Sequence, residues 1–233
     1  MIPQGIFITG TDTGVGKTFI AAGIASALKR QGINVGVMKP AHTGCKVKNG
    51  LLIPSDSITL AMAAAVNDPM DLITPYMFKE PVAPYIAAKE NNKRINPARI
   101  IKSFERLCKR HDYMVVEGIG GVLVPITRDF YVADLIKRFN IPALIVTRPG
   151  LGTINHTMLT INCLMERKIP IKGIVINYSS KGKAIPAEKS CVKTIKRLSD
   201  IPVMGIIPYM SKSMMTFLNP FLELHNSLFN IIG

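Results

Sequence analysis

The chain has 233 residues, 48% of them hydrophobic, and no stretch with the composition of a linker, so we expect a single domain over 1–233 with a sizeable core. Its four cysteines lie far apart without a C-x-x-C pair, which argues against a zinc site or a disulfide framework. The net charge of +14 leaves a nucleic-acid partner open, but the bases are scattered, and the densest basic stretch, 181–197, has the spacing of a solvated helix face. The N-terminus carries Gly, Thr and Asp where a signal peptide needs an unbroken apolar run, and no apolar run reaches the length of a membrane span, so we expect a cytoplasmic protein without a membrane or nucleic-acid partner.

Short apolar runs alternate with helical patterns along the chain. The runs are apolar on both faces, which is typical of buried strands in a parallel sheet covered by helices. They lie at 6–9, 35–38, 113–117, 143–147, 171–177 and 203–207. Start signals and periodicity predict helices at 17–31, 55–66 (capped by Ser55), 97–109, 132–139, 153–167 and 188–198. The predicted fold class is therefore α/β, with a mostly parallel sheet flanked by helices on both faces.

The longest stretch without a predicted element is 67–96. It contains Pro69, Pro75, Pro81 and Pro84, which are too many for a regular helix. Loops of this length in compact domains are usually functional, so we expect this one to serve the site.

A phosphate-binding motif follows the first predicted strand. Residues 10–18 read G-T-D-T-G-V-G-K-T and lead directly into a helical pattern. Glycines let backbone N–H groups turn toward a phosphate, Lys17 would reach the β and γ oxygens, and the Thr18 hydroxyl would bind Mg²⁺. Gly10 stands six residues before Gly16, one more than the strict G-x4-G-K-T pattern allows. The motif predicts a magnesium-dependent P-loop NTPase fold; a glycine-rich turn without a ligand is the alternative.

Three charged residues are candidates for the same edge of the sheet. Glu117 ends a buried strand, where it would bind the metal or merely cap a turn. Asp56 begins a helix, where it would bind the metal or merely complement the helix dipole. Lys39 follows a strand and precedes Pro40, which favours an extended backbone; from this alone it is either an active-site cation or a solvated strand end.

With these residues in place, the chain resembles the dethiobiotin synthetase family over nearly its whole length. Residues 10–18 are similar to the family's G-T-D-T-x-V-G-K-T, including the extra residue. Four further motifs follow in the family's order: K-P-x-x-[ST]-G at 39–44, P-Y-x-F-x-x-P-x-x-P at 75–84, V-E-G-A-G-G at 116–121 (with Ile119 in place of Ala) and L-G-x-I-N-H-x-x-L-T at 151–160.

The resemblance implies a reaction and a set of site residues. ATP, CO₂ and 7,8-diaminopelargonic acid would become dethiobiotin, ADP and phosphate through a carbamate and a carbamic-phosphoric mixed anhydride. Lys17 and Lys39 would be catalytic, and Thr43 would bind the carbamate. The Mg²⁺ ligands would be Thr18, Asp56 and Glu117. A homodimer would share the site for the substrate's far carboxylate, which involves Gly152, Thr153 and Asn155. The implied ATP-binding residues are Thr13, Gly14, Val15, Gly16, Lys17, Thr18, Phe19, Asp56, Glu117, Gly118, Ile119, Gly120, Asn177, Tyr178, Ile207, Pro208 and Tyr209.

Two details refine this expectation. Family members often have Asn-Asp where this chain has Asn177 and Tyr178, so we expect ATP to be used with weaker discrimination among nucleotides. His42 and His156 lie in motif loops, and we interpret both as hydrogen-bonded loop histidines, because no constellation for a general base is visible.

Two other functions remain as alternatives. A deviant P-loop ATPase of the DNA-partitioning or membrane-positioning type is suggested by the charge of +14, but such proteins resemble K-G-G-x-G-K-T and depend on its first lysine, where this chain has Asp12. A cobyrinate-type amidotransferase synthetase would need a glutaminase half, which the 233 residues do not contain.

Overall fold

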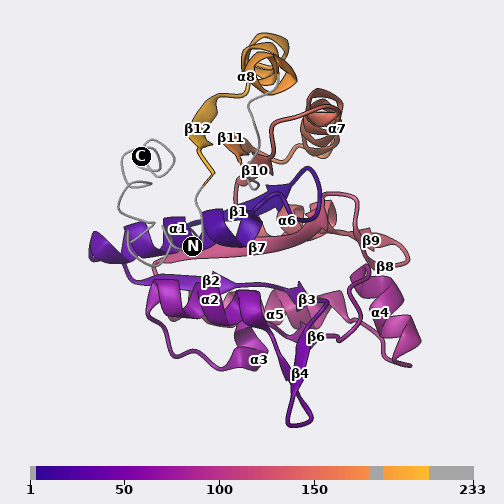
Figure 1. Ribbon diagram of the computed structural model, residues 1–233. Helices are drawn as coiled ribbons and strands as arrows, with labels where there is room; N and C mark the ends of the chain where they lie inside the picture. Colours follow the sequence, from indigo (N-terminus) through magenta and orange to yellow (C-terminus); the bar gives the residue numbers. More distant parts are fainter. Residues whose placement is uncertain (1–3, 179–185, 210–233) are drawn as a thin grey trace.

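The computed structural model describes residues 4–178 and 186–209, with only the backbone at 186–189. Its centre is a six-stranded sheet in the order β12-β11-β10-β1-β7-β2, and every neighbouring pair is parallel (Figure 1). The strands are β1 (Gly5–Gly10), β2 (Val35–Met38), β7 (Tyr113–Gly121), β10 (Ala143–Thr147), β11 (Ile171–Asn177) and β12 (Val203–Ile207). All six predicted strands and the parallel α/β fold are confirmed, and β7 extends four residues beyond its predicted end.

The six predicted helices are also present. They are α1 (Lys17–Arg30), α2 (Ser55–Ala64), α5 (Pro97–Cys108), α6 (Val132–Phe139), α7 (Thr153–Glu166) and α8 (Pro186–Leu198). The prediction that Ser55 caps α2 is wrong. Ser55 is itself the first helical residue, Pro54 holds the cap position, and the Ser55 hydroxyl lies 3.4 Å from the Asp56 carboxylate instead of bonding a helix N–H.

Two apolar cores lie on opposite faces of the sheet. Because successive strand residues point to opposite faces, Phe7 enters one core while Ile6 and Ile8 enter the other. Helices α1 and α2 cover the face with Ile6 and Ile8, and α5, α6, α7 and α8 contribute to the other core. Burial on both faces explains why the strands are continuously apolar.

The proline-rich segment 67–96 contains short elements that the sequence analysis did not predict. They are α3 (Met70–Ile73), β6 (Tyr76–Met77) and α4 (Pro84–Glu90). Helices form here because the prolines occupy starting positions: Pro69 is the N-cap of α3 and Pro84 is the first residue of α4, where a missing N–H costs nothing.

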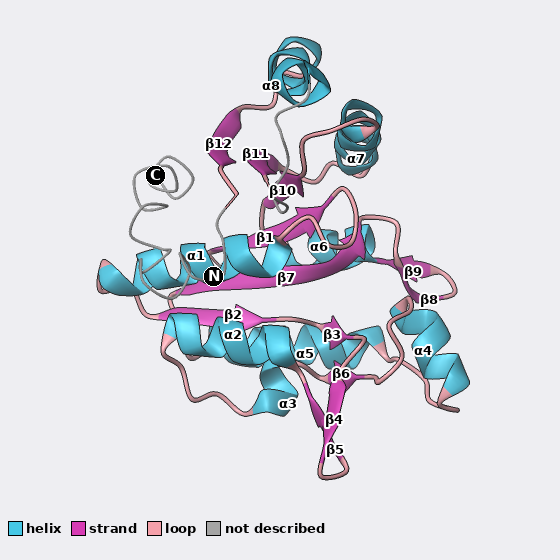
Figure 2. Ribbon diagram, viewed as in Figure 1, coloured by secondary structure: helices cyan, strands magenta, loops and turns pink. Residues whose placement is uncertain are grey.

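Small sheets surround the carboxyl edge of the central sheet (Figure 2). Strand β6 pairs in parallel with β3 (Ala41–His42), β4 (Lys46–Lys48) forms a hairpin with β5 (Leu51–Ile53), and β8 (Pro125–Thr127) pairs with β9 (Phe130–Tyr131). The segments that follow β1, β2 and β7 therefore meet at one edge. None of the helices in the described ranges is both long and apolar enough to cross a membrane.

Candidate active site

The turn between β1 and α1 forms a cradle that requires glycine at two positions. A Cβ on Gly10 would lie 2.8 Å from both the Lys17 ammonium nitrogen and the Asp12 carbonyl oxygen. Gly16 has φ +96°, and a Cβ there would lie 2.0 Å from Nδ2 of Asn177. The glycine positions singled out in the sequence thus reflect close approach of the chain to itself as well as backbone conformation.

Lys17 lies buried within this cradle. Its ammonium donates a hydrogen bond to the carbonyl oxygen of Asp12 at 2.8 Å. Burial lowers the pKa of Lys17 to about 8, although the carboxylate of Glu117 opposes this shift. An anion entering the cradle would favour the charged ammonium, so Lys17 is placed to gain a phosphate as its partner.

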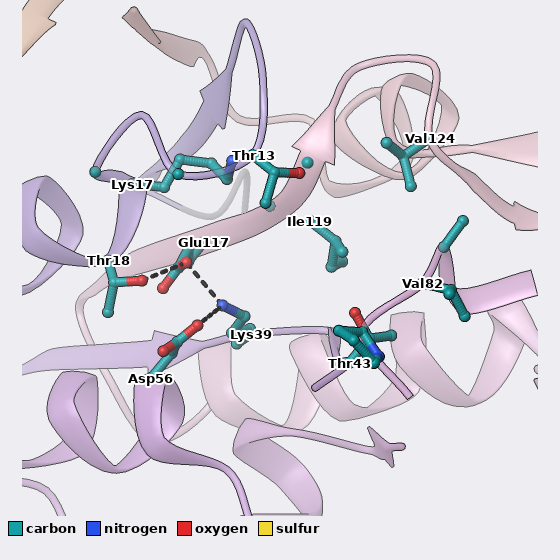
Figure 3. Close-up of a pocket in the computed structure, with 16 residues that line it drawn as sticks. Thr13, Lys17, Thr18, Lys39, Thr43, Asp56, Val82, Glu117, Ile119 and Val124 are labelled. Atoms are coloured by element: carbon teal, nitrogen blue, oxygen red, sulfur yellow. Dashed lines mark hydrogen bonds and ion pairs between the residues drawn. The ribbon is translucent and has the colours of Figure 1, made fainter. Parts of the chain in front are cut away.

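Four side chains meet next to the cradle, and we call Thr18, Lys39, Asp56 and Glu117 the metal corner (Figure 3). The Lys39 ammonium donates to Glu117 Oε1 at 2.8 Å and also to Asp56 Oδ2. The Thr18 hydroxyl donates to the same Glu117 oxygen at 2.8 Å. The three charged side chains predicted at this edge of the sheet are therefore brought together by β7, α2 and the segment after β2.

The charges in the metal corner determine one another's protonation. Burial raises the pKa of Glu117, which is only 1% exposed, and Lys39 opposes this effect. Burial alone would lower the pKa of Lys39, but the charges of Glu117 and Asp56 raise it above its ordinary value. Burial also disfavours the charged form of Asp56, yet Lys39 holds the pKa of this carboxyl below its usual range. Lys39 is thus the cation that favours the charged form of both carboxylates, although for Glu117 burial remains the larger effect.

The donors of the metal corner fit a magnesium ion. Glu117 Oε2 is buried and has no hydrogen-bond partner among the described residues, so it retains an unused acceptor. Within 4–178 and 186–209, no group of three or more His, Cys, Asp or Glu side chains could hold a metal by itself. Two carboxylates and a hydroxyl beside a phosphate cradle suit Mg²⁺, which completes its shell with phosphate oxygens and water.

A pocket of about 450 Å³ joins the cradle to the metal corner. The predicted site residues that line it are Thr13, Gly14, Gly16, Lys17, Thr18, Lys39, Thr43, Asp56, Glu117, Gly118, Ile119 and Gly120. The sequence analysis did not select four other lining residues, Pro81, Val82, Ala83 and Val124. The first three lie in the proline-rich motif at 75–84, which was the signal that could have identified them, whereas Val124 had none.

The residues predicted to reach the nucleotide base lie outside this pocket. Asn177 is the last residue of β11, and Tyr178 follows it. Ile207 is the last residue of β12, and Pro208 and Tyr209 follow it. The Asn177 amide donates to the carbonyl oxygen of Val15 at 2.9 Å, and the Tyr178 N–H donates to that of Ile207 at 2.9 Å. Val15 is fully buried and Phe19 partly buried, and neither lines the pocket.

The residues predicted to hold the substrate's carboxylate also lie away from the pocket. Gly152 precedes α7, Thr153 begins it, and Asn155, two residues further on, is exposed. The Thr153 hydroxyl is engaged internally, because it donates to the carbonyl oxygen of Arg148 at 2.5 Å and lies 2.8 Å from the Thr147 hydroxyl. Any contact of Thr153 with a ligand would therefore involve its backbone.

The interpretation of His42 as a hydrogen-bonded loop histidine is wrong. Its side chain is buried, Nδ1 has no partner among the described residues, and Nε2 lies 3.8 Å from Asp56 Oδ2. Burial, followed by the charge of Lys39, lowers the pKa of His42. His42 therefore packs as a neutral ring behind the metal corner, whereas His156 is exposed on α7.

Comparison with known proteins identifies the family. A family model described as an AAA domain matches residues 4–216. An ATP-dependent dethiobiotin synthetase of Thermodesulfovibrio yellowstonii is 44% identical over 215 residues, which cover 89% of this chain and 90% of that protein. The synthetase of Nitrosopumilus maritimus is 44% identical over 207 residues, covering 88% and 89%. That of Bacillus subtilis strain 168 is 38% identical over 205 residues, covering 88% and 87%.

Solved structures of similar fold include a cell division protein complex and an ATPase. A MinC:MinD cell division complex of Aquifex aeolicus matches with a TM-score of 0.61 at 20% identity, covering 98% of this chain and 93% of that chain. A ParA family ATPase of Chlorobium tepidum matches with a TM-score of 0.54 at 19% identity, covering 98% and 92%. Such identities show the fold alone, and they confirm the P-loop NTPase type. The partitioning or positioning alternative is not favoured, because the relatives at 38–44% identity are synthetases. The chain belongs to the ATP-dependent dethiobiotin synthetase family, which is a family of ligases.

Proposed function

We propose that this protein converts 7,8-diaminopelargonic acid and CO₂ into dethiobiotin, with ATP and Mg²⁺. One observation carries the proposal: a phosphate cradle and the metal corner open into the same pocket, together with Thr43. Family membership supplies the reaction, and the pocket supplies groups of the chemistry that this reaction requires. The reaction brings two anions together, the carbamate and the γ-phosphoryl group, so its main need is positive charge in fixed positions.

The cradle would hold the polyphosphate of ATP. Backbone N–H groups around Gly14 and Gly16 and the N-terminus of α1 supply partial positive charge. The Lys17 ammonium would give up its hydrogen bond to the Asp12 carbonyl oxygen and donate instead to oxygens of the β- and γ-phosphates of ATP. A ligand on Lys17 restores the full charge that burial disfavours, so the cradle and the nucleotide stabilise each other.

The metal corner would hold Mg²⁺ through the Thr18 hydroxyl, Asp56 and Glu117. When bound, the ion neutralises charge on the transferring phosphoryl group. Lys39 lines the same pocket as Thr43, and we assign these two residues to the oxygens of the carbamate. Thr43 would donate its hydroxyl hydrogen, and Lys39 would bring the positive charge that offsets the approach of carbamate to phosphate.

The covalent steps need no nucleophilic side chain. An amine of the substrate adds to CO₂ and releases a proton, which gives the carbamate. A carbamate oxygen then attacks the γ-phosphorus, and the bond between the γ-phosphorus and the oxygen that bridges to the β-phosphate breaks. ADP departs, and the product is a carbamic-phosphoric mixed anhydride. The second amine attacks the carbonyl carbon, releases phosphate and a proton, and closes the ring. The protein's part is to position these groups and stabilise their charge, through Lys17, Lys39 and Thr43.

We also propose a cytoplasmic homodimer in which Gly152, Thr153 and Asn155 contribute to the neighbouring subunit's substrate site. Two features support this. These residues do not line the pocket of their own subunit. Leu151, just before α7, is 97% exposed, and Leu159 on α7 is 59% exposed. Apolar side chains this exposed favour burial against another surface. Sedimentation of the unaltered protein would test whether it is a dimer. Sedimentation of an Asn155→Ala variant, together with its KM for the diamine, would test whether Asn155 contributes to the substrate site.

The direct test is a coupled phosphate assay. The protein is incubated with ATP, Mg²⁺, bicarbonate and diaminopelargonate, and with each component omitted in turn. We expect phosphate release that depends on the diamine, and dethiobiotin as the product in mass spectrometry. Phosphate release that is indifferent to the diamine would contradict the proposed function.

A further inference from the structure

A second cavity of about 450 Å³ is lined by residues of β5, β6, α5 and the segment between α4 and α5. Figure 2 shows where these elements lie. It shares no lining residue with the proposed active site. We call it the basic cavity and define it by Leu52, Tyr76, Met77, Lys93, Arg94 and Arg99. Its volume lies within the range of roughly 300–1,000 Å³ that is usual for small-molecule sites.

The basic cavity is lined by three cations and by no acidic residue. Lys93, Arg94 and Arg99 are exposed, and none of them forms an ion pair within the part of the chain that the structure describes. The carboxylate of Glu80, which is not among the lining residues, accepts a hydrogen bond from Asn91, and the charges of Lys79 and Lys93 also help to lower its pKa. Three cations around one cavity, with a single acid interacting with one of them, leave a net positive potential that attracts anions.

One of the cations, Arg99, stands over an aromatic ring in the cavity's lining. The guanidinium of Arg99 lies 5.1 Å from the centroid of the Tyr76 ring, a cation–π contact that orients both groups. The Tyr76 hydroxyl accepts the Asn96 N–H at 2.8 Å, which fixes the ring further. Leu52 and Met77 line the cavity together with Tyr76, and we call these three residues its floor. The cavity therefore combines oriented positive charge with a surface that favours an organic body.

We propose that the basic cavity binds a small organic phosphate with an aromatic or apolar body, such as a nucleoside monophosphate. Two guanidinium groups and an ammonium suit a phosphate, which carries more charge than a carboxylate and accepts bidentate bonds from arginine. The floor of Tyr76, Leu52 and Met77 suits the rest of such a ligand. The proposal concerns a site separate from the P-loop and does not depend on the proposed synthetase function.

A ligand at this site would lie one strand away from the reaction pocket. Tyr76 and Met77 form β6, which pairs with Ala41 and His42 of β3. Just beyond the pair, the Cys45 N–H donates to the carbonyl oxygen of Phe78 at 2.9 Å. These bonds hold the loop that carries Thr43. The segment that lines the basic cavity is therefore hydrogen-bonded to a segment that lines the pocket of the proposed active site.

The chain contains no tryptophan, so a Leu52→Trp variant gives a fluorescence signal from the cavity alone. We expect AMP to change this signal saturably at about 0.15 M salt, where distant surface charges are screened. Adding Arg94→Ala and Arg99→Ala should weaken binding by about tenfold or more, since two charge-assisted contacts are lost. Lys102→Ala with Arg106→Ala removes the same charge from exposed positions of α5 outside the cavity, and should leave binding nearly unchanged.

Three results would overturn the proposal. The first is loss of AMP binding on Lys17→Ala, which would assign the signal to the P-loop. The second is equal weakening by the Lys102→Ala and Arg106→Ala pair, which would reduce the effect to overall charge. The third is binding of inorganic phosphate as tight as that of AMP, which would remove the role of the floor. If Leu52→Trp does not fold, Met77→Trp reports from the same cavity, and calorimetry of AMP on the unlabelled protein measures the affinity directly.

Discussion

At the reaction end of the proposed nucleotide site, Lys17 and the metal corner bring together side chains from α1, α2, β7 and the segment after β2. At the base end, Asn177, Tyr178 and 207–209 sit on the ends of two neighbouring strands and outside the pocket. Lys17, Lys39 and Glu117 of the reaction end are buried and affect one another's charge, whereas Tyr209 is 38% exposed and Tyr178 is fixed through its backbone. The comparison teaches that burial makes these three charged residues depend on their partners, because an unpaired buried charge is costly. At the base end the side chains of Tyr178 and Tyr209 can vary at little cost, whereas Asn177 and Ile207 are buried.

Among the variants that test this difference, removal of Lys39 should have the largest effect on activity and stability. We expect Lys39→Ala to lower the diamine-dependent kcat/KM by about 10²-fold or more, because a group that stabilises the transition state is lost. It should also destabilise the fold by about 3–5 kcal/mol, since Glu117 would be left buried without its cation. Steady-state assays and chemical denaturation measure the two effects.

Two variants control this prediction. Lys137→Ala removes a charge from an exposed position of α6 and should change neither quantity. Lys39→Met combined with Glu117→Gln removes both charges and should recover stability but not activity. A diamine-dependent rate retained by Lys39→Ala would contradict the role assigned to Lys39.

The two ends of the site meet at Gly16, whose substitution should have the next largest effect. Gly16→Ala forces a side chain into a left-handed conformation and against the Asn177 amide, so we expect a loss of stability of about 2–3 kcal/mol and weaker nucleotide binding. Gly14→Ala imposes a left-handed conformation too, but nothing lies within 4 Å of its Cβ, so about 1 kcal/mol is expected. Equal losses in the two variants, measured by denaturation, would show that the contact with Asn177 is unimportant.

The same contrast explains how far the sequence could predict the molecule. The strands were predictable because burial on both faces leaves continuous apolar runs, and the cradle because phosphate binding requires glycine, lysine and threonine at fixed spacing. Glu117 and Lys39 were predictable as candidates, since parallel strands end at one edge. Their direct pairing was not, because it depends on distances between segments 78 residues apart in the chain.

The elements that were missed have a physical reason as well. Helix α4 begins at Pro84 and α3 follows Pro69, so prolines that read as helix breakers act as helix starters. Val82 and Val124 line the pocket without any chemical signal, because an apolar lining residue looks like any other apolar residue in a sequence. The burial of His42 without a partner for Nδ1 depends on the packing of β3 against neighbouring segments.

The pH dependence of nucleotide binding should sharpen the account of Lys17. The pKa of Lys17 in the free protein is about 8, and a bound phosphate raises it by favouring the charged form. Affinity should therefore be full below pH 8 and fall as pH rises through 8, by up to about tenfold per pH unit. The affinity for ADP, measured by titration at several pH values between 7 and 9.5 that span the pKa of about 8, tests this expectation. In Lys17→Arg the guanidinium does not titrate, so the slope should vanish even if affinity is lower. A flat profile for the unaltered protein would contradict the assignment.

Tyr178→Asp should have the smallest effect, because it changes the base end alone. The Tyr178 N–H is held by the carbonyl oxygen of Ile207, so a new side chain would start from the same strand end, beside Asn177. At position 6 of the base, the amino group of adenine can donate a hydrogen bond to a carboxylate there, whereas the carbonyl of guanine has no hydrogen to donate. We expect the ratio of kcat/KM for ATP over GTP to rise by about 3–10-fold, the size of one hydrogen bond to a charged group. Tyr178→Asn, which can both donate and accept, should raise the ratio less. An unchanged ratio in both variants, with stability intact, would mean that selectivity lies in the backbone of 207–209, and the base end would then be no more adjustable than the reaction end.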